Sequence, residues 1–116
     1  MEIQLKSKQI SNDDFIKKLE SQDLPNSINF ILKKRENNFR GLDPTVMVAI
    51  VSSAGTALGA LINGVLNIAK EKGSNSIVIQ DKNGRRVEFP ANCSKEKIEE
   101  IIHLLNQMEA PKIELP

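Results

Sequence analysis

The sequence predicts an α+β protein made of a β-α-β segment, a long apolar central helix, a β-hairpin and a C-terminal helix. Short stretches near both ends alternate apolar and polar residues, which is typical of half-buried strands. Residues 46–69 carry no charged side chain. Apolar residues near the C-terminus recur every three or four positions, as on one face of a helix. A chain of 116 residues is expected to form one domain.

Residues 1–42 predict the β-α-β segment. Residues 2–8 alternate, with isoleucine and leucine on one side of a short strand. Ser11 is suited to cap a helix whose first turn is acidic, because a side-chain oxygen there accepts backbone N–H bonds. Pro25 disfavours helix at the residue before it and so ends this helix. Residues 28–35 alternate again and predict a second strand that finishes in basic residues.

Residues 43–72 predict the long apolar helix. Asp43 is suited to the N-cap, Pro44 to the first helical position, and Gly73 to the helix stop. At about 1.5 Å per residue the charge-free stretch would extend roughly 36 Å, more than the roughly 30 Å hydrocarbon core of a bilayer. It is therefore a candidate transmembrane span, which predicts a single-pass protein of a bacterial inner membrane.

Small and polar residues recur on one side of this predicted helix. Gly55 and Gly59 form a G-x-x-x-G spacing, and Ala60 and Gly64 repeat it, which lets helix backbones approach closely. Each glycine costs a helix in water about 1 kcal/mol relative to alanine, so either lipid or close helix packing is expected to surround it. The predicted helix-packing and oligomerisation residues are Ser52, Gly55, Thr56, Gly59, Ala60, Asn63, Gly64 and Asn67.

Residues 73–110 predict a hairpin followed by a helix, and residues 111–116 a frayed tail. Asn83 and Gly84 are the pair favoured in a tight two-residue hairpin turn. Ser94 is placed to cap the last helix. The core-facing stripe of that helix is Ile98, Ile101, Ile102, Leu105 and Met108.

The titratable residues do not suggest a reaction, and we expect no enzyme, cofactor or metal site. His103 is the single histidine and follows two glutamates on the outer side of the last helix. Cys93 is the single cysteine, so it has no partner for an intrachain disulfide, which fits a reducing compartment and makes the cytoplasm the alternative location. Sixteen basic residues balance fifteen acidic ones, and aromatic residues are scarce, so nucleic acid is not an expected partner.

Three short stretches are distinctive when taken together with the order of the parts: Asp43-Pro44-Thr45-Val46, Ser53-Ala54-Gly55-Thr56-Ala57-Leu58 and Gly84-Arg85-Arg86-Val87-Glu88. With them the chain resembles the bacterial family called effector-associated constant component. The similarity runs from about residue 2 to residue 108. The chain departs from the family in its first helix, which lacks a tryptophan common there. The resemblance implies a non-enzymatic, helix-anchored component of a bacterial conflict or defence system, a companion of separate effector proteins such as proteases, and it supplies no catalytic residues.

Three functional hypotheses follow. The first is an accessory or adaptor protein that couples an effector partner to a membrane. The second is a soluble homo-oligomeric scaffold that associates through the glycine- and alanine-rich helix. The third is a membrane-disrupting pore element lined by Ser52, Thr56, Asn63 and Asn67.

Overall fold

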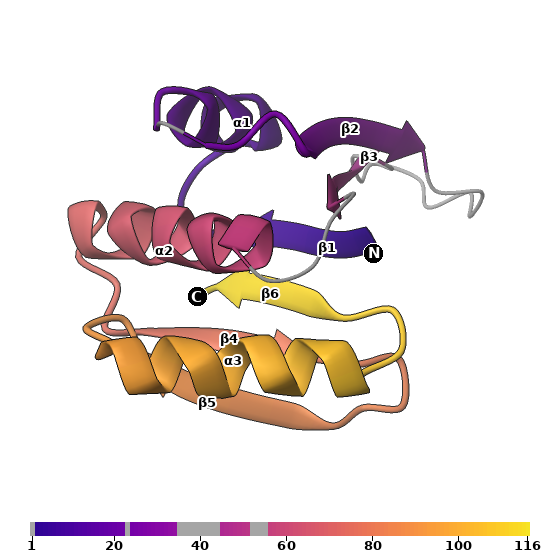
Figure 1. The fold of residues 1–116 in the computed structure, drawn as a ribbon. Helices are drawn as coiled ribbons and strands as arrows, with labels where there is room; N and C mark the ends of the chain where they lie inside the picture. Colours follow the sequence, from indigo (N-terminus) through magenta and orange to yellow (C-terminus); the bar gives the residue numbers. More distant parts are fainter. Residues whose placement is uncertain (1, 23, 35–44, 52–55) are drawn as a thin grey trace.

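A computed structural model describes residues 2–22, 24–34, 45–51 and 56–116. Figure 1 shows the resulting α+β fold. In chain order the elements are β1 (Glu2–Ser7), α1 (Asn12–Glu20), β2 (Ile28–Lys34), β3 (Thr45–Val51), α2 (Thr56–Glu71), β4 (Ser76–Gln80), β5 (Arg86–Pro90), α3 (Lys95–Gln107) and β6 (Lys112–Leu115).

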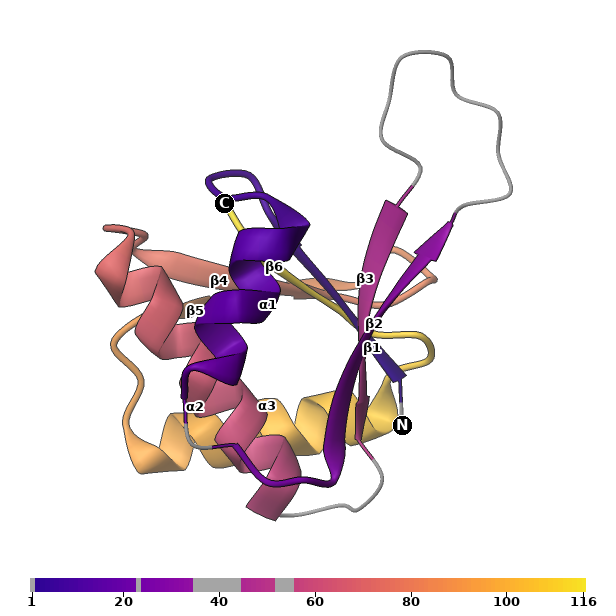
Figure 2. The same ribbon diagram turned by 90° about the horizontal axis from the view of Figure 1, so that it is seen from above.

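The described strands form one mixed sheet of six strands in the order β2-β3-β1-β6-β4-β5. β1 and β6 are parallel, and every other neighbouring pair is antiparallel. It follows that each helix connects two parallel strands: α1 joins β1 to β2, α2 joins β3 to β4, and α3 joins β5 to β6. If all three crossovers have the usual right hand, all three helices fall on one face of the sheet. Figure 2 shows them there, inside the concave side of the strongly twisted sheet.

The strand register separates an inner face from an outer face. Leu5 lies opposite Met47, and Met47 lies opposite Leu32 on the other side, so these three positions share the inner face. Gln4 and Ile31 both lie opposite Val48 and share the outer face. Inner positions of the central strands are fully buried, as the alternation of the sequence requires.

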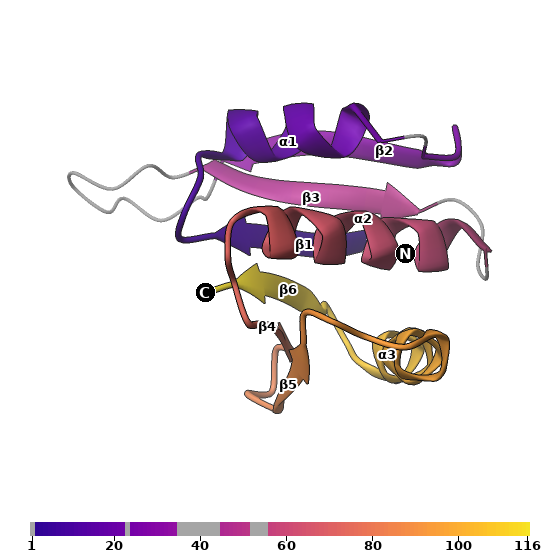
Figure 3. The ribbon, with the colours of Figure 1, turned by 90° about the vertical axis from the view of Figure 1, so that its left-hand side faces the viewer.

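The central helix is α2, which contacts both α1 and α3 and lies over the sheet (Figure 3). Apolar residues cover most of its circumference, which is the pattern of a helix enclosed by other elements. Its buried side chains, each at most 2% exposed, are Ala57, Leu58, Leu61, Ile62, Val65, Leu66, Ile68 and Ala69.

The prediction of one long helix over residues 43–72 is wrong, because the structure divides this stretch into β3 and α2. Residues 45–51 are mostly β-branched, and such side chains favour the pleated strand. The 16 residues of α2 extend only about 24 Å, short of the hydrocarbon core of a bilayer. Among the described residues no helix has the length and hydropathy to cross a membrane, which contradicts the predicted single-pass inner-membrane location. The capping residues proposed at positions 43 and 44 lie outside the described residues.

The C-terminal residues 111–116 belong to the sheet and are not a frayed tail. β6 lies between β1 and β4 and pairs with both. Ile113 and Leu115 are at most 2% exposed. The strand has only four residues, so its two inward-facing side chains give too short an alternation for sequence patterns to distinguish it from a coil.

The β4–β5 hairpin forms as predicted, but its turn is longer than two residues. Gln80 pairs with Arg86, which leaves five residues in the connection. The Asp81 carboxylate accepts the backbone N–H groups of Asn83 and Arg85 at 2.9 and 3.0 Å, and Gly84 has φ of +89°. An aspartate that bonds the backbone two residues on therefore organises this turn.

The N-caps predicted at Ser11 and Ser94 are confirmed. The Ser11 hydroxyl accepts the Asp14 N–H at 3.2 Å, and the Ser94 hydroxyl accepts the Lys97 N–H at 3.3 Å. In α3 the predicted stripe faces inward, with Ile101 and Leu105 fully buried.

Exchanging the glycines of α2 for alanine tests whether the helix surroundings differ at the two positions. A Cβ at Gly59 would lie 3.5 Å from Ile102 Cδ1, an ordinary van der Waals separation. We expect Gly59→Ala to raise the free energy of unfolding by up to about 1 kcal/mol, because alanine is the better helix former. Gly64→Ala should gain less, since its Cβ would press on Gln22 and Leu19. Thermal unfolding followed by circular dichroism measures both; a lower melting temperature for Gly59→Ala than for Gly64→Ala would contradict the described packing.

Candidate interaction site

The eight residues predicted as a helix-packing face do not form one free surface. Gly59 lies beside Ile102 of α3, and Gly64 lies against Leu19 and Gln22, so both serve packing within the chain. Ala60 is half-buried, while Asn63 and Asn67 are exposed and Thr56 begins α2. Ser52 and Gly55 lie outside the described residues.

Gln22, at the end of α1, fastens this helix to α2. Its side-chain Nε2 donates to the Gly64 carbonyl at 2.9 Å, and its Oε1 accepts from Asn67 Nδ2 at 3.2 Å. A side chain at position 64 would stand 3.4 Å from this amide, so glycine leaves room for the contact. The small and polar residues of α2 are thus explained in part by contacts inside the monomer.

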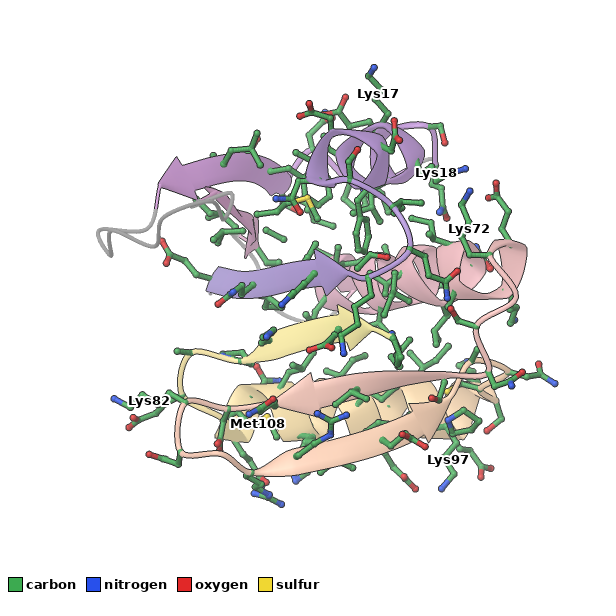
Figure 4. The ribbon with its side chains drawn as sticks, turned by 180° about the vertical axis from the view of Figure 1, so that it is seen from behind. Lys17, Lys18, Lys72, Lys82, Lys97 and Met108 are labelled. Carbon is green, nitrogen blue, oxygen red and sulfur yellow. The ribbon has the colours of Figure 1, made fainter. Side chains whose placement is uncertain are left out.

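Several titratable side chains of the described residues form pairs at the surface. Lys18 donates to Glu71 at 2.7 Å across α1 and α2, a hydrogen bond that lowers the Glu71 pKa, and Lys82 pairs with Glu109 at 2.9 Å. Figure 4 labels both lysines. His103 is exposed and within 3.0 Å of the Gln107 amide. No three metal-binding side chains gather within the part of the chain that the structure describes.

Cys93 is half-buried at the loop before α3. Its thiol donates to the Pro90 carbonyl at 2.8 Å. Burial raises the pKa of this thiol despite the nearby positive charges of Lys70 and Lys97. The protonated thiol is the weaker nucleophile, so the setting favours a structural role for Cys93.

Glu114 of β6 is the one charged side chain that the described residues bury, at 8% exposed. It lies on the outer face between Lys8 and Lys112, with N–O distances of 3.4 and 3.5 Å. Burial by itself raises the pKa of Glu114, but the charges and hydrogen bonds of the two lysines outweigh it and hold the pKa below its ordinary value. The ionised carboxylate therefore stabilises the fold.

A pH series on Glu114→Gln tests this contribution. Because the folded-state pKa is depressed, the stabilisation is present above the ordinary glutamate value of 4.5 and is lost as pH falls through the folded pKa. Wild type should melt above the variant at neutral pH, and the difference should shrink as the pH falls below 4.5 and through the depressed folded-state pKa. If the melting temperatures of wild type and variant differ by the same amount at neutral and at low pH, the carboxylate charge is not the cause of the difference.

The two edge strands of the sheet differ in how they meet solvent. On β5, exposed Arg86 and Glu88 alternate with apolar residues, and Pro90 ends the strand. Alternating charges and proline are common means of keeping an edge strand from pairing with another chain. The β5 edge is therefore protected against strand addition.

We call the side of strand β2 that faces away from β3, with Ile31 and Leu32, the β2 edge. This edge lacks such protection along its first five residues, Ile-Asn-Phe-Ile-Leu. Leu32 is the large apolar side chain that the described residues leave exposed, at 46%. Phe30 and Ile31 are half-buried. In the described part of the chain no strand pairs with the side of β2 that faces away from β3. The first five residues of this edge are therefore suited to accept another strand.

Apolar side chains continue from this edge onto the outer face of the sheet. Ile31 lies opposite Val48, and Ile50 follows on β3 beside Asn29. Ile50 and Ile31 are half-buried although no helix of the described residues covers this face. A shallow hollow of about 320 Å³ adjoins the start of β2, lined by Glu20, Gln22, Leu24, Pro25, Asn26, Ile28, Asn29 and Phe30.

Sequence reasoning identified β2 as a strand but not as a site, because its edge position follows from pairing with β3 and from the crossover through α1.

Comparisons with protein-family models, with curated proteins and with solved structures found no match for this chain.

Proposed function

We propose that the chain is a non-enzymatic scaffold protein that self-associates through the β2 edge. The observation that carries the proposal is the contrast between the two sheet edges: β5 bears alternating charges, whereas β2 exposes Leu32 within an apolar run. Burying such side chains against another strand removes apolar surface from water and satisfies the free backbone groups of the edge.

This proposal retains the homo-oligomeric hypothesis but moves the contact away from α2. Gly59 and Gly64, two of the expected contact residues, face α3 and α1 of the same chain. The membrane-anchored and pore hypotheses are set aside, since they require a membrane-spanning helix and α2 is too short to be one.

The resemblance to the effector-associated constant component family extends the proposal to a setting. A self-associated scaffold brings two or more copies of a bound partner together, which raises their local concentration. In a bacterial conflict system, the partner would be a separate effector protein. The Gly84-Arg85-Arg86-Val87-Glu88 stretch of the resemblance lies at the β4–β5 turn and the start of β5, at the opposite edge from β2, so it would remain accessible to such a partner.

The mass of the full chain in solution tests self-association. Light scattering should give about twice 12.9 kDa or a higher multiple for the wild-type chain. Ile31→Lys should shift the mass toward the monomer value, because a buried lysine without a partner charge is costly to desolvate. Measurements from about 10 μM to about 1 mM cover contacts of ordinary affinity.

Glu88→Lys is the matched control, since residue 88 is the middle, exposed, outer-face position of the other edge strand. It should leave the mass unchanged. A wild-type chain that stays monomeric throughout the concentration range would refute the scaffold proposal. An equal loss of association in both variants would show that the contact is not confined to β2.

A further inference from the structure

We propose that two copies of the chain join by antiparallel pairing of β2 with β2, with Ile31 on the two-fold axis, so that two six-stranded sheets become one continuous sheet. This inference rests on the proposed self-association and specifies its geometry. Three features support the register: the length of the strand, the order of its residues, and the faces on which they lie.

The length of β2 selects the centre of the pairing. The strand has seven residues, Ile28–Lys34, and its middle residue is Ile31. Pairing centred on Ile31 gives the longest ladder, with residue 30 opposite residue 32 of the second copy, 29 opposite 33, and 28 opposite 34, where the Ile28 N–H already donates to the Pro25 carbonyl at 3.2 Å. Any shift shortens the ladder and leaves backbone groups at one end without partners.

The order of charged residues selects the same centre. Both lysines of β2 occupy its last two positions, 33 and 34. Antiparallel pairing about Ile31 places the lysine positions of the two copies at opposite ends of the ladder, facing Asn29 and Ile28. A centre at position 33 would set lysine positions directly opposite each other, and like charges there are destabilising. Parallel pairing in register would also juxtapose them.

The faces are compatible with this arrangement. Phe30 and Leu32 share the inner face, because they lie opposite Ala49 and Met47, which are both fully buried. Opposite residues of an antiparallel pair project to the same face. Phe30 of one copy would therefore lie beside Leu32 of the second. By symmetry the same contact forms a second time, so that Leu32, which is 46% exposed, is covered in both copies. The helices of both copies would then lie on one side of the joined sheet.

The outer face gains a continuous apolar strip at the axis. Ile31 of each copy would be flanked by Val48 and Ile50 of its own β3, so that the strip crosses from one copy to the other. The hollow beside the start of β2 would lie near position 34 of the second copy.

Single cysteines in β2 test the register directly, in full-length chains that also carry Cys93→Ser, a change that keeps a donor for the Pro90 carbonyl. The expected result with a short bismaleimide is cross-linked dimer from I31C alone. N29C and K33C should each give at least about tenfold less cross-linked dimer. In each of these variants the two cysteines are offset by four residues along the ladder, which separates them by roughly 13 Å. A mixture of N29C and K33C should restore the product, since these positions face each other.

The outcomes separate the inference from the proposal beneath it. A dimer by light scattering in which N29C or K33C alone cross-links as well as I31C overturns the register and leaves self-association intact. A dimer that none of the three variants cross-links overturns β2 pairing altogether. A monomer by light scattering ends both. Circular dichroism melting of each variant confirms that a missing product does not come from an unfolded chain.

Discussion

The enclosure of α2 is the constraint on which the rest of the structure depends. This helix contacts the sheet, α1 and α3, and eight of its apolar residues between Ala57 and Ala69 are at most 2% exposed. Gly59 lies next to Ile102 of α3, Gly64 lies next to Leu19 of α1, and the Gln22 amide donates to the Gly64 carbonyl. These close contacts offset part of the cost of glycine in a helix, although alanine would fit at either position.

The local elements of this fold follow from the sequence wherever one physical signal dominates. Ser11 and Ser94 are recognisable caps because a hydroxyl before an acidic or polar turn satisfies backbone donors. Residues 2–7 and 28–34 alternate because one face of each strand is buried. The helix of residues 95–107 shows its inward stripe for the same reason. These features depend on neighbours in the chain, which a sequence displays.

The sequence predictions were wrong where the apolar residues follow neither helix nor strand periodicity. Residues 45–51 carry apolar side chains on both faces, since Val48 is buried on the outer side and Met47 on the inner side. Such a run does not distinguish a strand from a buried helix segment, and joining it to α2 produced a helix long enough to span a membrane. β6 was missed because its pairing partners, β1 and β4, come from distant parts of the chain. The candidate site was missed for the same reason, because an edge exists only after the sheet is assembled.

The order of the sheet explains why the two edges are so unlike. β5 follows β4 through a turn held by Asp81, so its edge must meet solvent with charges of its own, and Arg86 and Glu88 provide them. β2 reaches the other edge by crossing over with α1, and its inner face, with Phe30 and Leu32, is covered incompletely. A charged edge on one side of the sheet and a leucine 46% exposed on the other make β2 the edge at which strand addition is expected. In the proposed pairing, addition would stop at a dimer, because a two-fold contact occupies the β2 edge of each copy and leaves only the charged β5 edges outside.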